Sequence, residues 1–372
     1  MIKFFKYFNE FNKEKRSLLK SIDRVLVSGQ FILGPEVKKF ENAFSKFIGT
    51  KYGVGVGNCT DAIYICLKAL NIGKGDEVIT AANTAIPTIT AIINSGAKPK
   101  LVDINENYLI DHKKIPTCIN KKTKAIIPVH LYGQTCDMNE ILKISKKYKL
   151  KFIEDCAQST GSKFNGKRSG SFGDFGCFSF YPTKVLGGVG DGGFITTNNL
   201  KLYKRVRNLR YMGMETNKDS KLKYKNMYYA YENGTNSRLD EIQAAILSCK
   251  LKEINKLIKI RQSNAKLYFK MLKNSEIILP RSNQINNDTY YEFVVSHKNR
   301  DKIIKHLKKN NINVKITYPY PIHKMQAYKK YGSKKVLKKT EYLRNKIFSL
   351  PIYVGLSEMK IKFICKKIKE AA

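Results

Sequence analysis

The sequence contains no tryptophan and few arginines. Only 11 of its 69 basic residues are arginine, and the lysines that make up the rest are spread along most of the chain. Arginine is the residue that reads guanine edges and clamps phosphates with two hydrogen bonds. Outside the short stretch 204–210, the chain has no arginine-rich segment or basic arm. The net charge of +39 therefore does not predict specific nucleic-acid binding.

Long apolar runs are also missing. No run approaches the roughly 18–20 residues that a transmembrane helix needs, and residues 1–16 lack the apolar stretch and cleavage site of a signal peptide. We therefore expect no membrane association and a cytoplasmic location. The eight cysteines form no Cys-x-x-Cys pair, and the five histidines do not lie near them at metal-ligand spacing. Free thiols and no metal site are expected.

Hydrophobic residues make up 42% of the 372 residues, which is enough for a sizeable core and about two domains. From about residue 50, short apolar runs alternate with helical patterns, which predicts an α/β fold with a mainly parallel sheet covered by helices. Such sheets bind ligands beyond the carboxyl ends of their strands. The expected strands are 52–57, 77–81, 100–104, 124–130 and 150–154, and the expected helices are 61–70, 88–94 and 137–148.

The pattern changes after residue 244. We expect one long helix over 241–261, followed by a stretch at 268–278 and a loop around 280–288. A strand at 292–296 and a helix at 301–310 follow. These elements predict a large domain with an N-terminal arm, residues 1–250, and a smaller C-terminal α+β domain, residues 251–372.

Lys184 is the most informative residue. It ends the stretch 178–184 (FSFYPTK) and is the only lysine among the 32 residues from Ser169 to Leu200. Its flanks are rich in phenylalanine, glycine and serine, which is typical of a semi-buried site. A desolvated lysine becomes a nucleophilic amine, as Schiff-base chemistry requires. We interpret Lys184 as that amine rather than as one more surface lysine.

Asp155 ends an apolar run at the carboxyl end of a predicted strand. Alone it would be an ordinary strand-end acid or a helix cap. Because it lies 29 residues before Lys184, it becomes a candidate for the carboxylate that keeps a pyridine nitrogen protonated. That charge pair makes pyridoxal phosphate an electron sink.

Two glycine-containing turns are candidates for phosphate binding. Residues 57–61 (GNCTD) join a strand to a helix, and a helix N-terminus binds phosphate through its free N–H groups; a plain helix cap by Asn58 or Thr60 is the alternative. Residues 188–193 match the dinucleotide pattern G-x-G-x-x-G, but that motif must open a helix. Here it leads into an expected strand at 194–197, so we discount it.

Taken together, these residues resemble the DegT/StrS-type family of pyridoxal-phosphate-dependent sugar aminotransferases, over almost the whole chain. The matching stretches are 31–37 (FILGPEV), 58–61 (NCTD), 129–134 (VHLYGQ), 154–158 (EDCAQ), 178–184 (FSFYPTK), 190–193 (GDGG), 236–245 (NSRLDEIQAA), 320–323 (YPIH) and 349–353 (SLPIY). The resemblance implies an aspartate-aminotransferase-like (fold type I) homodimer with shared active sites.

The resemblance also implies a role for each matching site residue. Lys184 would carry the cofactor and shuttle the proton, and Asp155 would pair with the pyridine nitrogen. The remaining cofactor-binding residues implied are Gln158 beside the 3-hydroxyl, Cys59, Thr60 and Ser179 at the phosphate, and Asn236 at the partner subunit's phosphate. The candidate substrate-binding residues are Tyr318, His323 and Arg238.

Alternatives remain for two of these substrate residues. His323 is a candidate contact to the sugar or its phosphates, or a structural histidine of its loop. Arg238 is a candidate for the donor's carboxylate, or it pairs with Asp240 or Glu241.

Two positions depart from the family pattern. Position 85, usually aromatic and stacked on the pyridine ring, is alanine here, so stacking must be weaker or come from elsewhere. Position 59, commonly glycine, is cysteine, and a thiol at a helix N-terminus is expected to have a lowered pKa and to oxidise readily. Relatives that dehydrate sugars have histidine in place of the lysine, and Lys184 argues against that branch.

The predicted reaction transfers the amino group of L-glutamate to a nucleotide-linked keto-sugar, making an amino-sugar nucleotide for surface polysaccharide or glycoconjugate synthesis. The stretch 318–323 (YPYPIH) favours a 3-keto-6-deoxyhexose over a 4-keto sugar. An amino-acid transaminase of the same fold is an alternative that the stretch 236–245 argues against. A non-catalytic regulatory or scaffold protein is another, and the presence of Lys184 and Asp155 argues against it.

Overall fold

The computed structural model describes residues 1–214, 228–281, 286–332 and 337–372. Its large sheet has seven strands in the order β1-β9-β8-β5-β4-β2-β3. β9 runs antiparallel to β1 and β8, and the other neighbours are parallel. The strands of this sheet are β1 (Tyr52–Val56), β2 (Glu77–Ala81), β3 (Lys98–Val102), β4 (Thr123–Ile127), β5 (Lys151–Asp155), β8 (Phe175–Ser179) and β9 (Gly193–Thr197).

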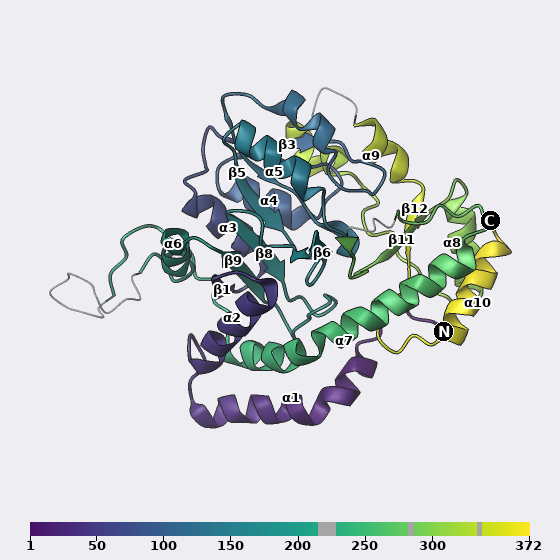
Figure 1. The fold of residues 1–372 in the computed structure, drawn as a ribbon, viewed down its shortest axis with the longest axis horizontal. Coiled ribbons are helices and arrows are strands. Elements are labelled where there is room, and N and C mark those ends of the chain that lie inside the picture. Colours follow the sequence, from purple (N-terminus) through teal and green to yellow (C-terminus); the bar gives the residue numbers. More distant parts are fainter. Residues whose placement is uncertain (215–227, 282–285, 333–336) are drawn as a thin grey trace.

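Helices cover both faces of this sheet (Figure 1). The α-helices are α1 (Phe8–Ser28), α2 (Pro35–Ile48), α3 (Cys59–Ala69), α4 (Ile86–Asn94), α5 (Met138–Lys147), α6 (Leu200–Arg210), α7 (Glu241–Leu272), α8 (Arg300–Lys309), α9 (Lys338–Leu343) and α10 (Glu358–Lys369). The side chains of α3 pack with alternate strand residues such as Ile153 and Cys177, whereas α2 and α7 pack with Phe178 on the opposite face. This alternation follows from the two-residue repeat of a strand.

Short elements complete the structure that the described residues show. The 3₁₀ turns are η1 (His112–Lys114), η2 (Pro116–Cys118), η3 (Leu131–Gly133), η4 (Ile322–Lys324) and η5 (Gln326–Tyr331). The strands β6 (Lys163–Phe164), β7 (Lys167–Arg168) and β10 (Asn286–Asn287) form one small sheet, and β11 (Phe293–Ser296) and β12 (Ile347–Leu350) form another.

The α/β fold and all eight elements predicted between residues 50 and 154 are confirmed, with shifted ends. β3 begins two residues earlier than expected, at Lys98, because Pro99 is tolerated in this edge strand. β4 ends at Ile127 because Pro128 has no N–H to continue the ladder. The expected loop at 280–288 lies partly outside the described residues, since 282–285 are not described, and Asn286–Asn287 forms β10.

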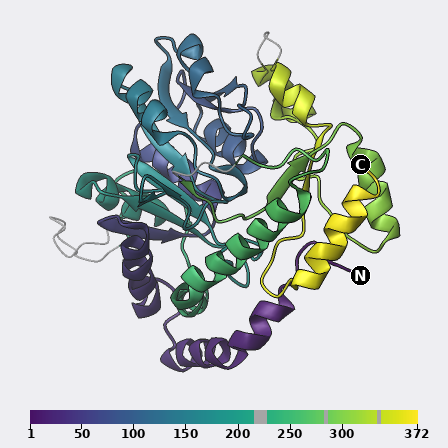
Figure 2. The same ribbon diagram turned by 45° about the vertical axis from the view of Figure 1, so that its right-hand side comes forward.

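The second half of α7 belongs to a separate C-terminal core. Ala265, Tyr268 and Leu272 pack there with β11, β12, α8 and α10. The N-terminus joins this core, because Ile2 is buried in it and bridges Ile312, and both ribbon views place the N-terminus beside α10 (Figures 1 and 2). The expectation of a separate stretch at 268–278 was wrong, since α7 continues to Leu272. Because α7 passes position 250 without a break, the domain boundary there stays a prediction.

None of the helices in the described ranges combines the length and the apolar character needed to cross a bilayer. The strongest grouping of metal-ligand types among the described residues is His130, Glu154 and Cys156. Glu154 already accepts hydrogen bonds from His130 and from the backbone N–H groups of Gly170, Phe172 and Gly173. We therefore interpret this cluster as a buried hydrogen-bond network of the core, in which the carboxylate of Glu154 already has its partners.

Candidate active site

The strands β1, β9 and β8, at one side of the large sheet, bring the start of α3 close to Ser179. Gly193, the first residue of β9, pairs with Val56 at the end of β1 and with Ser179 at the end of β8. A Cβ atom added to Gly193 would lie 2.3 Å from the backbone carbon of Asn58. Only glycine permits this approach, which holds the start of α3 next to Ser179. The rejection of the dinucleotide motif is confirmed, because residues 188–193 lead into β9 and not into a helix.

The N-terminus of α3 has a cap that leaves its first N–H groups available. The side chain of Asn58 accepts a hydrogen bond from Asp61 N–H at 2.9 Å. The preceding N–H groups, those of Cys59 and Thr60, belong to the set that has no partner inside the helix. A helix N-terminus with such groups attracts an anion. Cys59, Thr60 and Ser179 therefore lie close together, and their role as phosphate ligands stays a prediction.

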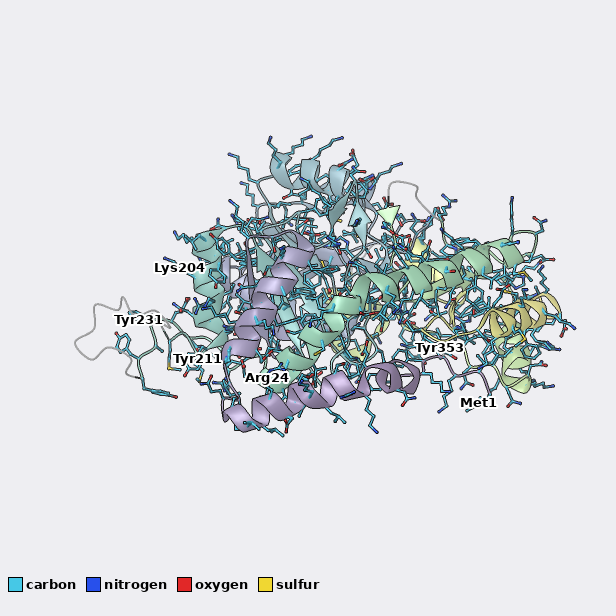
Figure 3. All side chains as sticks on the ribbon, turned by 60° about the horizontal axis from the view of Figure 1, so that its bottom comes forward. Met1, Arg24, Lys204, Tyr211, Tyr231 and Tyr353 are labelled. Atoms are coloured by element: carbon cyan, nitrogen blue, oxygen red, sulfur yellow. The ribbon has the colours of Figure 1, made fainter. Side chains whose placement is uncertain are left out.

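The turn before α3 is tied to the segment that contains Asn236. Ser237 Oγ accepts from Gly57 N–H at 2.9 Å and donates to Asp61 Oδ2 at 2.7 Å. Asn236 itself is exposed, and its backbone bridges Tyr211. In Figure 3, Tyr211 lies toward the end of the molecule opposite Met1. The exposed position of Asn236 is compatible with a contact to a second subunit, which stays a prediction.

The thiol of Cys59 does not have the lowered pKa that its helix position suggested. Burial, together with the nearby carboxylate of Asp155, raises the pKa of the Cys59 thiol well above its usual value. The side chain packs into the core beneath α3, while only its backbone N–H faces the helix end. The sequence-based expectation of a reactive thiol was therefore wrong, because desolvation outweighs the helix dipole here.

Asp155 is the last residue of β5 and is almost completely buried. Its Oδ2 accepts from Thr88 Oγ1 at 2.7 Å, and its Oδ1 accepts from Ala157 N–H at 3.1 Å. Burial raises the pKa of Asp155, although these two hydrogen bonds and the positive charge of Lys184 act in the opposite direction. A carboxylate offers about four acceptor positions, so this one has capacity for a further cationic donor.

Lys184 lies in the loop after β8 and is half-buried. Its charge acts to lower the pKa of both Asp155 and Cys59, so the three groups lie within electrostatic reach of one another. Its Nζ lies 4.6 Å from the centre of the Tyr291 ring. The amine, the buried carboxylate and the anion-binding helix end are therefore neighbours at one edge of the sheet.

Gln158 and Tyr318, predicted as cofactor-binding and substrate-binding residues, are brought into direct contact. Gln158 Nε2 donates to Tyr318 Oη at 2.7 Å, and Gln158 Oε1 accepts from Tyr132 N–H at 2.8 Å. Ala85 is the residue that precedes α4, so it lies one turn before Thr88 on the approach to Asp155. The missing ring at position 85 is thus a real difference in the surroundings of the site.

Among the described residues, the side chains of His323 and Arg238 contact groups other than Lys184 and Asp155. His323 Nε2 lies 2.9 Å from Glu341 Oε1, as a structural loop histidine would. Arg238 stacks on the ring of Tyr211 at 5.5 Å. The alternative partners proposed for Arg238 are occupied elsewhere: Asp240 caps α7, and Glu241 accepts from backbone N–H groups at the start of α2.

Sequence reasoning missed Thr88, Tyr132 and Tyr291. Each reaches the site through a contact with another segment of the chain. Tyr132 falls in the matching stretch 129–134, but nothing in that stretch indicated its contact with Gln158. A threonine in the first turn of a predicted helix resembles many others. The double tyrosine at 290–291 resembles an ordinary strand start.

The donor set of the site fits pyridoxal phosphate. Its phosphate would meet the N–H groups of Cys59 and Thr60 and the hydroxyl of Ser179. A protonated ring nitrogen would supply the cationic donor that the carboxylate of Asp155 can still accept. The cofactor's aldehyde would meet the amine of Lys184. Each chemical feature of the cofactor therefore has a matching group in this chain.

Comparison with known proteins agrees with this fit. The model of the DegT/DnrJ/EryC1/StrS aminotransferase family matches residues 12–369. The chain is 39% identical over 358 residues to the dTDP-3-amino-3,4,6-trideoxy-alpha-D-glucose transaminase of Micromonospora megalomicea subsp. nigra, covering 94% of this chain and 93% of that protein. It is 42% identical over 355 residues to the dTDP-3-amino-3,6-dideoxy-alpha-D-galactopyranose transaminase of Aneurinibacillus thermoaerophilus, covering 95% of each.

The fold has a close match among solved structures. The crystal structure of DesV from S. venezuelae, in complex with a ketimine intermediate, superposes with a TM-score of 0.93 at 33% identity, covering 99% of this chain and 98% of that chain. The family model spans nearly the whole chain and both relatives exceed 30% identity over most of it. The chain belongs to the DegT/DnrJ/EryC1/StrS aminotransferase family, and it is a pyridoxal-phosphate-dependent aminotransferase.

Proposed function

We propose that this protein transfers the amino group of L-glutamate to a nucleotide-linked keto-sugar. Glutamate leaves as 2-oxoglutarate, and the sugar leaves as an amino-sugar nucleotide for surface polysaccharide or glycoconjugate synthesis. The observation that carries the proposal is the convergence of Lys184, Asp155 and the N-terminus of α3 at one sheet edge. A 3-keto-6-deoxyhexose is favoured over a 4-keto sugar, and the two relatives named for 3-amino sugars support this.

In the proposed mechanism, each residue of the chain has a limited task. When bound, pyridoxal phosphate supplies an electron-withdrawing ring and a carbonyl that exchanges oxygen for nitrogen. The carboxylate of Asp155 holds the proton on the ring nitrogen. Lys184 Nζ takes a proton from one carbon and returns it to another, because an amine at the cofactor's reactive side can act as base and then as acid.

The remaining residues orient the bound molecules. The N–H groups of Cys59 and Thr60 and the hydroxyl of Ser179 would bind the phosphate, and Gln158, which donates to Tyr318, would hold the ring hydroxyl. We propose that Asn236 reaches the phosphate in a second copy of the chain, so that the active unit is a homodimer. Arg238, which has no ion pair among the described residues, is available for the donor's carboxylate.

The visible absorption spectrum tests this function. The protein reconstituted with pyridoxal phosphate should show a yellow band that bleaches on addition of L-glutamate. The band should be absent from Lys184→Ala, while Lys146→Ala, an ordinary helix lysine of α5, should keep it. A screen of 3-keto and 4-keto nucleotide sugars then identifies the acceptor. Absence of any band after incubation with the cofactor would contradict the proposal.

A further inference from the structure

Tyr291 contacts the lysine loop from a distant part of the chain. The face of its ring lies under Lys184 Nζ, 4.6 Å from the ring centre. Its hydroxyl lies 3.2 Å from Thr183 Oγ1, 108 positions away in the sequence. One side chain therefore touches two consecutive residues of the loop that carries the reactive amine.

The backbone around Tyr291 is held firmly. A Cβ atom added to Gly133 would lie 2.6 Å from the backbone nitrogen of Tyr291, so the two segments pack as closely as glycine allows. The N–H of Glu292 donates to Tyr132 O at 3.3 Å, and the buried guanidinium of Arg261 donates to Tyr290 O at 3.2 Å. The segment that carries the Tyr291 ring therefore contacts η3 on one side and α7 on the other.

A lysine amine at the end of four rotatable bonds does not keep one position by itself. An aromatic face attracts an ammonium group within about 6 Å of its centre. Some other lysine–tyrosine contacts in the described chain, such as Lys147 with Tyr148 at 5.4 Å, join sequence neighbours at the surface, whereas buried Lys250 contacts the distant ring of Tyr7 at 4.9 Å. The Lys184 contact differs because it joins two segments at the site that also contains Asp155.

We propose that Tyr291 is a positioning residue for Lys184: its ring face holds the amine in the orientation in which it meets the cofactor's aldehyde. This inference rests on the proposed function and adds to it a residue from the C-terminal half of the chain. Holding the amine in a reactive orientation removes an entropic cost from the first covalent step. In that step the Lys184 nitrogen bonds to the aldehyde carbon, and the aldehyde oxygen leaves as water.

The test measures this step in the cofactor-free protein, and not catalytic turnover. Pyridoxal phosphate is mixed with apo-protein, and the rate at which the absorption band forms is recorded. In parallel, the affinity for 4-deoxypyridoxine 5′-phosphate is measured, because this analogue has the ring and phosphate but no aldehyde. Tyr291→Leu should slow band formation roughly fivefold to tenfold, with the analogue's affinity within about twofold of the parent's.

Three comparisons decide the outcome. Tyr291→Phe keeps the ring and should form the band at the parent rate. If Tyr291→Phe and Tyr291→Leu slow band formation equally, the proposed role of the ring face is wrong. Tyr148→Leu, the matched surface control, should leave both quantities unchanged. A parallel loss of analogue affinity in Tyr291→Leu would mean that the residue shapes the whole pocket, and the proposal would be wrong.

A shape-preserving substitution protects the test against misfolding. Incorporation of 3,4,5-trifluorophenylalanine at position 291 keeps the ring's outline but weakens the negative charge of its face. Band formation should then be slower than in Tyr291→Phe, and an equal rate would contradict the inference. If the parent protein itself forms no band, the proposed function fails first, and the two failures are distinguishable.

Discussion

Two buried aspartates lie at the carboxyl ends of parallel strands in the same sheet, and they have opposite electrostatic surroundings. Asp103 directly follows β3, and Asp155 ends β5. Their exposed fractions are nearly equal, 4% and 3%. Burial by itself raises the pKa of a carboxyl group in both places.

The difference lies in the number of donors. Asp103 accepts from Thr340 through both its hydroxyl and its N–H, from Lys339 N–H, and from the ammonium of Lys114. These bonds outweigh burial and lower the pKa of Asp103 to about 2. Among the described residues, Asp155 has Thr88 and Ala157 alone as hydrogen-bond donors, and its pKa is raised.

The comparison distinguishes a carboxylate that the fold satisfies from one that keeps capacity for a ligand. Asp103 accepts hydrogen bonds from N–H groups at the start of α9 and so joins this helix to the large sheet. Its negative charge is therefore stabilised by contacts within the fold. Asp155 is left with acceptor capacity in a buried position within electrostatic reach of Lys184. A buried charge that the fold does not satisfy costs stability unless a ligand completes it, and such perturbed groups concentrate at functional sites.

The largest effect is expected from removing the functional charge. Asp155→Asn should lower the transamination rate roughly 10³-fold, as loss of one preorganised electrostatic contact in an active site does. The unfolding free energy of the apo-protein should stay the same or rise, because burial disfavours the ionised form. Denaturant unfolding and a glutamate half-reaction assay measure the two quantities. A large loss of apo stability with retained activity would reverse the roles assigned here.

Asp103→Asn should have the opposite profile. Asp103 accepts five hydrogen bonds, including one from Ile104 N–H. Replacing this carboxylate weakens buried charge-assisted hydrogen bonds, so the unfolding free energy should fall by about 3 kcal/mol. The folded fraction should keep its activity within a few-fold, since Asp103 lies away from Lys184 in the sheet order. Urea unfolding monitored by circular dichroism provides the measurement, with Asp111→Asn, a partly exposed neighbour, as control.

The contributions of the two aspartates to the unfolding free energy should also change differently as the pH falls. The pKa of Asp103 is lowered in the folded state, so its stabilisation is fully present above the unfolded value near 3.8 and is lost as the pH falls towards 2. The shift corresponds to about 2 kcal/mol. The pKa of Asp155 is raised, so its ionisation disfavours folding as the pH increases past the unfolded value. Acid titration of Asp103→Asn should therefore show a shallower loss of stability than the parent, and an identical curve would contradict this assignment.

The smallest effect is expected from a single donor to Asp155. Thr88→Val keeps the shape but removes the hydroxyl that lowers the pKa of Asp155. That pKa should rise further, so the acidic limb of the activity profile should move to higher pH, with about a tenfold loss of rate near neutrality. Thr88→Ser should restore most of the parent behaviour. A pH profile unchanged in Thr88→Val would show that Ala157 N–H suffices.

The local sequence pattern by itself predicted the fold class and marked the candidate site residue Lys184. Alternating apolar runs and helices predicted the parallel sheet, and the lysine-free surroundings of Lys184 marked it as exceptional among 69 basic residues. These features are readable because strand and helix periodicity and glycine-rich turns are properties of short segments. The resemblance of successive motifs then placed Asp155, Gln158 and the start of α3 in one family site.

Tertiary structure alone decided the rest. Thr88 reaches Asp155 and Tyr291 reaches Lys184 across 67 and about 107 positions of chain, and no local pattern encodes such contacts. The helix position of Cys59 suggested a reactive thiol, but the depth at which α3 packs raises its pKa. Asp103 and Asp155 look alike in sequence, since each ends a hydrophobic strand. The fold brings α9 against Asp103, whose charge it satisfies, and leaves Asp155 near Lys184 with acceptor positions still open. This difference arises only in the folded chain.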